Sequence, residues 1–392
     1  KIHYIWGILD ATGNGQSHQT KRISMKTKTT LMVVALFLLV GLMSASAQAD
    51  SLTVEQLVDM ALQDNPTLTA MRAEWAAMRE MSTQGEALPN PMVAYKGMDT
   101  TDNFPGTDEQ RYEAQQTFPW PGKRGLKGRL AEKDAEKTRL EYEAMRRETV
   151  MMVKESYYEL CAARKSIAVV QAEEAVLKQM VQVVETKYAT GEVNQQDVTK
   201  AQAEMPMLQG KLLELQARES TLLARLNMLI NRSAADPLEL RIEPPPRVPV
   251  GEIDPLLAEA QTNRPEIKAS QVLVERGEAQ RALMRKEYLP DLTVGFEYRQ
   301  LSGTADDMAM FMVGVDLPIW HGKNAAGVRE AERRIASGRA AVEAAKNETQ
   351  FDVRQGWFKL RNAQQTLDLY EKELVPQSEL RFQASEAGYR AG

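Results

Sequence analysis

Short segments of alternating apolar and polar residues occur in two pairs along the chain, at residues 92–96 and 111–118 and at 292–300 and 308–317. A strict period of two predicts β-strands with one apolar face. The third segment shows it most clearly, because its two faces carry Leu292, Val294, Phe296 and Tyr298 on one side and Thr293, Gly295, Glu297 and Arg299 on the other. The pattern fits a hairpin on a soluble core as well as a membrane-barrel strand of about ten residues.

A long helical segment follows each predicted strand pair. In the first half it covers 124–189, and these 66 residues would extend about 100 Å as a helix. A helix of this length needs lateral support from a partner. Gly191 ends it and a returning helix begins near Asn194, so we expect a long antiparallel helical hairpin. The alternative, a compact bundle, rarely needs helices this long.

Both helices of this hairpin carry apolar residues at alternating spacings of three and four, which is typical of a coiled-coil seam. Charged residues interrupt it at Arg164, Glu174 and Glu219. The single cysteine, Cys161, falls in the same pattern and is expected to be a buried thiol. The predicted seam consists of Val150, Val153, Tyr157, Leu160, Ile167, Val170, Leu177, Val181, Val184, Tyr188, Val198, Ala201, Met205, Leu208, Leu212, Leu215, Leu222, Leu226 and Leu229.

The second half of the chain repeats the first at an offset close to 200 residues, which predicts an internal structural repeat. Each copy begins with one helical segment, at 52–85 and at 253–288. We divide the chain into a first repeat at 50–235, a proline-rich linker at 236–252 and a second repeat at 253–392. The second copy has no counterpart of the first copy's returning helix, so we interpret it as truncated before its final helix. The matching segments are 65–68 and 264–267, 88–89 and 289–290, 118–123 and 317–323, 148–149 and 348–349, 157–158 and 357–358, and 188–191 and 389–392.

The N-terminal region has the pattern of a secretory signal. Met25 is followed by two lysines, a 13-residue apolar run and an Ala-Ser-Ala exit at residues 45–47. The apolar run is shorter than the roughly 20 residues that a membrane-spanning helix needs. We therefore interpret 1–24 as non-native upstream translation and 25–49 as a cleaved signal peptide, with a retained membrane anchor as the less favoured alternative.

Charge and composition exclude several function classes. The chain has a net charge of −5, which becomes −9 when the leader, with five Lys or Arg and one Asp, is removed. An acidic chain is a poor candidate for nucleic-acid binding. Outside the leader His321 stands alone, without a Cys or His partner at metal-ligand spacing, and no nucleophile–base pair is recognisable. We therefore expect no enzyme, cofactor or metal site, and interpret the 20 methionines mostly as flexible apolar filler.

Several short motifs inside this duplicated plan resemble those of the TolC-like outer-membrane efflux proteins, over nearly all of residues 50–392. The segment from Phe118 to Arg124 is most similar to members that serve heavy-metal and cation pumps. The motifs are Asn65-Pro66, Phe118-Pro119 leading into Gly122-Lys123-Arg124, Leu226-Asn227-Met228-Leu229, and Leu374-Val375-Pro376-Gln377 followed by Tyr389-Arg390-Ala391-Gly392.

The resemblance implies a mainly α fold with a small antiparallel β part. Duplicated long-helix hairpins would form a periplasmic tunnel, and each chain of a homotrimer would contribute four strands to a shared twelve-stranded outer-membrane β-barrel. Sharing the barrel removes the open strand edges that lipid does not tolerate. In this arrangement the face of Phe296 meets lipid, whereas Glu297 and Arg299 line the barrel lumen.

The implied function is a passive exit channel of a tripartite export pump for heavy-metal cations or drugs, in the outer membrane of a Gram-negative bacterium with a periplasmic extension. Its partners would be a periplasmic adaptor, an inner-membrane pump and outer-membrane lipid. Family precedent places the gate and the adaptor contacts at the hairpin tips, here Tyr188, Thr190, Gly191, Asn194 and Asp197, and Tyr389, Arg390 and Gly392. Ordinary turn chemistry explains Thr190 and Gly191 equally well.

The alternative function is a periplasmic coiled-coil adaptor, which also uses a long helical hairpin. An adaptor is expected to have one hairpin flanked by small β domains. Two strand pairs that each lead into a long helix favour the channel.

Overall fold

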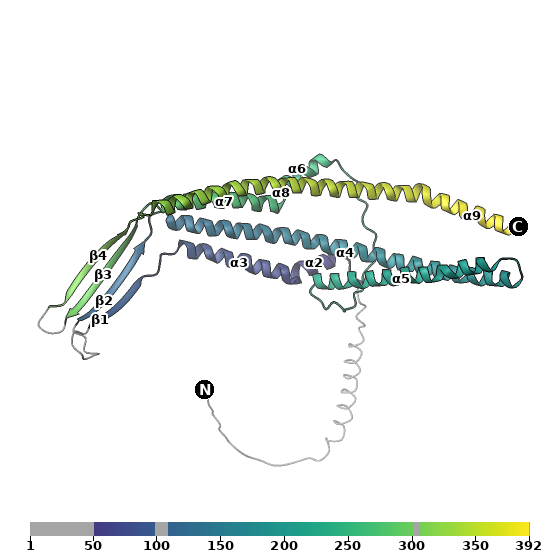
Figure 1. Ribbon diagram of the computed structural model, residues 1–392, viewed down its shortest axis with the longest axis horizontal. Coiled ribbons are helices and arrows are strands. Elements are labelled where there is room, and N and C mark those ends of the chain that lie inside the picture. Colours follow the sequence, from purple (N-terminus) through teal and green to yellow (C-terminus); the bar gives the residue numbers. More distant parts are fainter. Residues whose placement is uncertain (1–50, 99–108, 302–305, 392) are drawn as a thin grey trace, which may run out of the picture. The chain divides into compact units, whose positions relative to one another are not determined.

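The computed structural model describes residues 51–98, 109–301 and 306–391 (Figure 1). The predicted upstream segment and signal peptide, at 1–24 and 25–49, lie outside these residues, as does Gly392. The two halves of the chain have the same order of elements: two short helices, two strands and a long helix. The elements are α2 (Val54–Asp64), α3 (Pro66–Glu86), β1 (Met92–Met98), β2 (Glu109–Phe118), α4 (Lys123–Ala189), α5 (Gln195–Leu229), α6 (Ile253–Asn263), α7 (Pro265–Lys286), β3 (Asp291–Leu301), β4 (Met308–Asp316), α8 (His321–Leu369), η1 (Tyr370–Leu374) and α9 (Val375–Ala391).

Each half begins with two helices, so the single segments predicted at 52–85 and 253–288 are wrong. The backbone is extended at Asn65 (φ −64°, ψ 122°) and at Arg264 (φ −71°, ψ 123°). Both residues precede a proline, whose ring excludes the helical conformation of the preceding residue and favours the first position of a new helix.

Asn65 stabilises the break in the first half. Its side-chain oxygen accepts hydrogen bonds from the backbone N–H groups of Thr67 (2.9 Å) and Leu68 (3.2 Å), which caps α3. Its side-chain amide donates to the carbonyl of Leu229 at 2.9 Å. The start of α3 is thereby attached to the end of α5.

The four strands form one antiparallel sheet in the order β1-β2-β3-β4, with β1 and β4 at its edges (Figure 1). The pairing of β2 with β3, from Glu109 opposite Leu301 to Phe118 opposite Leu292, joins the two halves. The predicted strands are confirmed to within two residues at each end, because the period-two pattern identifies a two-faced sheet whatever covers its faces.

The long hairpin is confirmed: α4 has 67 residues and packs along α5 beyond the ends of α2 and α3 (Figure 1). Most predicted seam positions are sheltered, and Val153, Leu160 and Leu226 are fully buried. Tyr188 is an error, since its side chain is 47% exposed. It lies in the last turn of α4, where the partner helix has not yet begun.

Two of the three charged interruptions of the seam face each other. Arg164 Nε on α4 donates to Glu219 Oε1 on α5 at 2.8 Å, so the two gaps form one polar layer. Glu174 instead pairs with Lys178 of its own helix at 2.8 Å. The polar layer specifies which turn of α4 lies beside which turn of α5, because a shift would leave both charges without a partner.

The long helix of the second half contains a π-helical turn, η1, that the sequence did not reveal. The backbone N–H of Val375 donates to the carbonyl of Tyr370, five residues earlier. Pro376 follows immediately and has no N–H to donate, so the helix changes its hydrogen-bond pattern at this point.

Contacts group the described residues 51–52 with 239–241 in a small first unit, and the remaining described residues contain all the elements named above. In the first unit the N–H of Leu52 donates to Glu239 O (2.9 Å) and the N–H of Arg241 donates to Leu52 O (3.0 Å). Among the described helices, none combines the length and the apolar character that crossing a bilayer requires.

Candidate functional site

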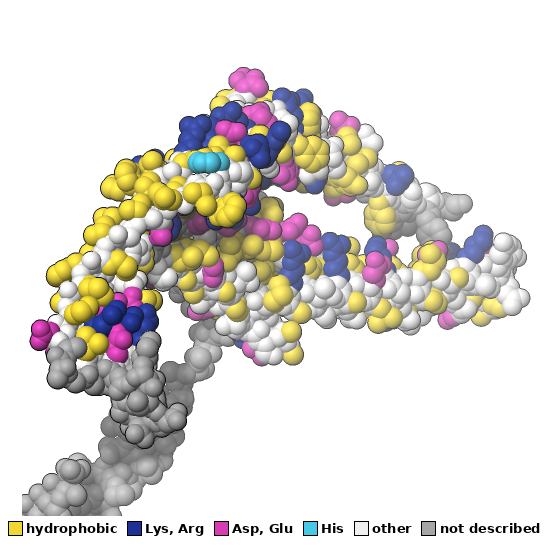
Figure 2. Space-filling view, turned by 60° about the vertical axis from the view of Figure 1, so that its left-hand side comes forward, with side chains coloured by type: hydrophobic (Ala, Val, Ile, Leu, Met, Phe, Trp, Pro, Cys, Tyr) yellow, Lys and Arg dark blue, Asp and Glu magenta, His cyan; other side chains and the backbone are white. Residues whose placement is uncertain are grey.

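One face of the sheet is apolar and exposed. Phe311 at the centre of β4 is 83% exposed, although it is among the most apolar side chains of the chain. Figure 2 shows hydrophobic side chains along the strands. The register places on this face Val93, Tyr95, Tyr112, Ala114, Phe118, Leu292, Val294, Phe296, Tyr298, Ala309, Phe311, Val313 and Val315. An exposed apolar surface that extends over four strands marks a contact with lipid or with another protein.

Aromatic pairs cross this apolar face from strand to strand. The ring of Tyr112 lies 5.3 Å from that of Tyr95 and 6.4 Å from that of Tyr298, which makes a row of tyrosines over β1, β2 and β3. Phe296 and Phe311 pair at 5.2 Å nearer the middle of the sheet. A row of tyrosines beside an apolar band is typical of the aromatic girdle at a membrane interface.

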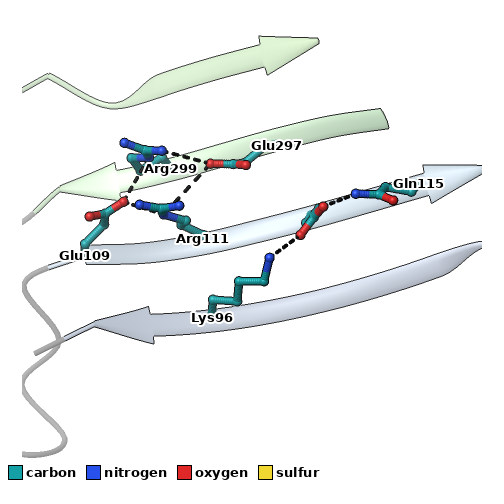
Figure 3. A network of polar contacts seen from close by, with 7 residues as sticks. Lys96, Glu109, Arg111, Gln115, Glu297 and Arg299 are labelled. Atoms are coloured by element: carbon teal, nitrogen blue, oxygen red, sulfur yellow. Dashed lines mark hydrogen bonds and ion pairs between the residues drawn. The ribbon is translucent and has the colours of Figure 1, made fainter. Parts of the chain in front are cut away.

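The opposite face carries a network of ion pairs (Figure 3). Glu109 Oε1 lies 2.5 Å from Arg111 Nε and 2.9 Å from Arg299 Nε, and Glu297 Oε1 lies 3.2 Å from an Nη atom of Arg299. Figure 3 shows these four side chains, from β2 and β3, pointing toward one another. Glu297 and Arg299, predicted from the sequence as polar-face residues, therefore lie together, but they form only half of this group.

A second ion pair continues the network toward β1. Lys96 Nζ lies 2.7 Å from Glu113 Oε2, and the side-chain amide of Gln115 donates to the same carboxylate. The whole network contains three basic and three acidic side chains, so its charges cancel. Sequence reasoning missed Glu109, Arg111 and Glu113, although Arg111 and Glu113 alternate with apolar residues as Glu297 and Arg299 do.

Three methionines of β4 share the polar face. Met308, Met310 and Met312 lie opposite Arg299, Glu297 and Gly295 in the register, and all three are exposed. They are not part of an apolar core, so the interpretation of methionine as core filler does not hold for β4. The described ranges contain no group of three or more His, Cys, Asp or Glu side chains arranged to hold a metal ion.

The turn between α4 and α5 contains the predicted tip residues of the first half. Gly191 has φ +79°, a conformation that favours glycine. Thr190 Oγ1 donates to the carbonyl of Lys187 at 3.0 Å. The N–H of Asn194 donates to Asp197 Oδ2 at 3.3 Å, which caps the start of α5. These four residues thus have structural roles in the turn, and their contact with an adaptor stays a prediction.

The predicted tip residues of the second half lie at the end of α9. The backbone of Tyr389 and Arg390 is helical up to Ala391, and Gly392 lies outside the described residues. Their role as gate residues stays a prediction.

The two halves are also joined through α4 and α7. Lys133 Nζ lies 2.7 Å from both Glu136 and Glu275, and hydrogen bonds to these carboxylates raise the pKa of Lys133. Arg276 Nε lies 2.5 Å from Asp134 Oδ1 beside this group. Polar pairs therefore hold the first-half and second-half helices in register, as β2 and β3 do in the sheet.

Comparison with known proteins identifies the family of this chain. The model of the family described as outer membrane efflux protein matches residues 57–232 and 256–392, which is most of the chain. The chain belongs to the outer membrane efflux protein family. The resemblance seen in the sequence motifs is thereby confirmed, and this membership makes the chain an outer-membrane efflux channel.

Individual members of the efflux family agree in sequence and fold. The cobalt-zinc-cadmium resistance protein CzcC of Cupriavidus metallidurans is 24% identical over 359 residues, which covers 88% of this chain and 81% of the relative. The outer membrane protein VceC of Vibrio cholerae has a TM-score of 0.72 at 18% identity, with 86% of each chain covered. The open-state outer membrane channel MtrE of Neisseria gonorrhoeae has a TM-score of 0.67 at 17% identity, with 86% and 79% covered. The predicted mainly α fold with a small antiparallel sheet is confirmed.

Proposed function

We propose that this chain is one of three identical subunits of a passive exit channel, which serves a tripartite pump that exports heavy-metal cations. The observation that carries the proposal is the two-sided sheet: its apolar face is exposed, its opposite face is ion-paired, and the outer edges of β1 and β4 have no strand beside them in the described part of the chain. Such a sheet suits a wall between lipid and water.

Closure of the wall requires more than one chain. Open strand edges are not tolerated in lipid, and four strands do not close into a barrel. Three copies would supply twelve strands, an even number that permits closure. Glu297 and Arg299 would then line the lumen, whereas the face of Phe296 would meet the lipid of the outer membrane. The long helices would continue into the periplasm of a Gram-negative cell.

The neutral polar network bears on selectivity. Because its three acidic and three basic side chains cancel, the network adds little net attraction to ions of either sign in the barrel lumen. Substrate choice is therefore left to the inner-membrane pump. Divalent metal cations are proposed as cargo because the relative CzcC is named for cobalt, zinc and cadmium resistance.

The hairpin tips are the proposed gate and adaptor-contact region. In the first half they comprise Tyr188, Thr190, Gly191, Asn194 and Asp197, and in the second half Tyr389, Arg390 and Gly392. We infer that the tip opens when the periplasmic adaptor docks, while the barrel keeps one shape. The tip of the first hairpin supports this division, because hydrogen bonds between residues close in sequence hold its turn.

Deletion of the gene in its host tests the proposal. We expect the deletion strain to become sensitive to cobalt, zinc or cadmium salts, and the intact gene on a plasmid to restore growth. The expressed protein should be a heat-stable trimer in the outer-membrane fraction. Drug sensitivity without metal sensitivity would keep the channel and replace the cargo. A soluble monomer would overturn the channel and favour the adaptor alternative.

A further inference from the structure

The start of α4 is held by a buried lysine. Lys123 is 3% exposed, and its Nζ donates to the carbonyl of Leu289 at 3.0 Å and to Asp291 Oδ1 at 2.9 Å. The N–H of Trp120 donates to the same Asp291 oxygen at 2.7 Å. The strand-to-helix junction that leaves β2 is therefore attached to the helix-to-strand junction that enters β3, in the other half of the chain.

One backbone hydrogen bond near the start of α8 matches one at the start of α4, although α4 begins at Lys123 after Gly122 at φ +90° and α8 begins at His321, two residues before Lys323. In both places the N–H of the lysine donates to the carbonyl of the tryptophan three residues earlier, at 3.0 Å. The side chain of the residue after each lysine also donates to the carbonyl of a glutamate, at corresponding positions in the two halves. Arg124 Nε donates to the carbonyl of Glu86 at 2.7 Å, and the Asn324 side chain donates to the carbonyl of Glu287 at 3.2 Å.

These paired contacts fix the correspondence between the two junctions. Glu86 corresponds to Glu287, so Leu88 and Asn90 of the first half correspond to Leu289 and Asp291, the residues that hold Lys123. By this correspondence, the acceptors expected for Lys323 are the carbonyl of Leu88 and the side chain of Asn90.

Within one chain Lys323 does not have these acceptors. Its side chain is exposed, and in the described part of the chain it makes no hydrogen bond or ion pair. Asn90 is exposed as well, and its side chain makes no hydrogen bond to any described residue. Lys323 follows the edge strand β4, whereas Asn90 precedes the opposite edge strand β1.

The apolar side chains around Lys323 are more exposed than their counterparts around Lys123. Trp320 is 73% exposed, against 40% for its counterpart Trp120. Leu317 is 68% exposed, against 41% for its counterpart Phe118. The second junction thus has the residues of the first without the surface that covers them.

We propose that Lys323 of one copy binds the junction in front of β1 of the next copy, donating from Nζ to the Leu88 carbonyl and to the side-chain oxygen of Asn90. The inference rests on the proposed trimeric channel and names a contact that holds it together. The pairing of β2 with β3 within a chain is then repeated by the pairing of β4 with β1 of the next copy. With the same offsets, Asp316 lies opposite Met92 of the next copy.

The contact between chains is weaker than its counterpart within a chain. Asp291 offers Lys123 a carboxylate, whereas Asn90 offers Lys323 a neutral amide oxygen, and hydrogen bonds between two charged groups are the stronger kind. Exchange of Asn90 for Asp would therefore give the contact between chains the chemistry of the contact within a chain.

Four variants of the full chain in detergent test the contact: Lys323→Met, Asn90→Asp, the two combined, and Lys359→Met as the matched control on an exposed lysine of the same helix. The readouts are the temperature at which the trimer dissociates in dodecyl sulfate and the helical circular dichroism. We expect Lys323→Met to lower the dissociation temperature and Asn90→Asp to raise it. The control should stay at the wild-type value, and no variant should lose helical signal.

A carbodiimide, which joins an amine to a carboxylate in direct contact, adds a covalent readout. The Asn90→Asp protein should form a cross-link between Lys323 and Asp at position 90 that joins two copies, and the combined variant should not. The cross-link of Lys123 with Asp291 inside one chain serves as the positive control in every variant.

Two outcomes distinguish a failure of the proposed contact from a failure of the proposed channel. If the wild type is a trimer but Asn90→Asp stabilises it equally with and without Lys323, the contact is overturned and the channel stands. If the wild type does not form a trimer, both are overturned.

Discussion

Tyr157 lies in the packed centre of α4, where burial raises the pKa of its phenol to about 12. Tyr158, the next residue, also has its pKa raised by burial. Cys161 is buried one turn later, as the helical pattern predicted. The period of the helix places Tyr157 and Cys161, because they lie one turn apart on the face of α4 that turns toward its neighbours.

Alkaline pH tests the environment of Tyr157. The phenol ionises near pH 10 in the unfolded chain and near pH 12 in the folded chain, so the stability from its neutral form is complete below pH 10 and is lost as pH rises through this window. We expect Tyr157→Phe to lose less free energy of unfolding between pH 10 and 12 than the exposed control Tyr188→Phe, as measured by urea unfolding. Equal slopes for both variants would contradict the assignment.

Leu226 is fully buried where α5 meets α4, and it tests the packing of the seam. We expect Leu226→Ala to lower the free energy of unfolding by about 2–5 kcal/mol, because the cavity cannot collapse between two long helices. Met228, two residues away and exposed, is the control, and Met228→Ala should change stability by less than about 0.5 kcal/mol. Thermal or urea unfolding followed by circular dichroism measures both; equal losses would place the seam on another face.

At the scale of the elements, three features hold the helical hairpin of α4 and α5 together. Its two stripes face each other, its polar layer of Arg164 and Glu219 sets their register, and its turn is closed by Gly191. The apolar period specified that two helices pair, whereas the match of the charged interruptions became visible only when α4 and α5 lay side by side.

Gly191, in the turn between α4 and α5, tests the stability of the hairpin. At φ +79° a side chain clashes with its own backbone, so Gly191→Ala should destabilise the hairpin by about 1–2 kcal/mol. Gly210 lies inside α5 with open space around it, so Gly210→Ala should stabilise the helix instead. Opposite signs in urea unfolding of the two variants are expected; a stabilising Gly191→Ala would show that the turn is not left-handed in solution.

For the whole molecule, the cancelled charges of the ion-pair network predict weak ion selectivity at its level of the lumen. Glu297→Gln would leave an excess of positive charge and should shift the reversal potential of reconstituted channels toward anion selectivity. The double variant Glu297→Gln/Arg299→Gln removes the pair without changing net charge, and it should keep the wild-type potential. An unchanged reversal potential in Glu297→Gln would place this face outside the ion pathway.

The proposed gate belongs to the same scale. Tyr389→Ala and Arg390→Ala in the full-length channel should raise single-channel conductance in planar bilayers, because smaller side chains widen a constriction. Exposed Leu380→Ala, earlier in α9, serves as the control. Conductance that matches wild type in both tip variants would remove these residues from the gate.

Local patterns determined much of this protein. The period of two located the strands, the spacing of three and four located the seam, and duplicated motifs showed that the second half repeats the first. The helix breaks at Pro66 and Pro265 were also readable, because a proline excludes helix from the residue before it, but the long apolar pattern on either side concealed them.

Other features were decided only by tertiary structure. Glu109 joined Arg299 because β2 pairs with β3 in one register, and Lys123 became buried because its acceptors are carried by a junction more than 160 residues away. A sequence records which face of its own element a side chain occupies, since that depends on local geometry. It does not record which element will face that side chain, because pairing and packing over long distances select among many locally equivalent partners.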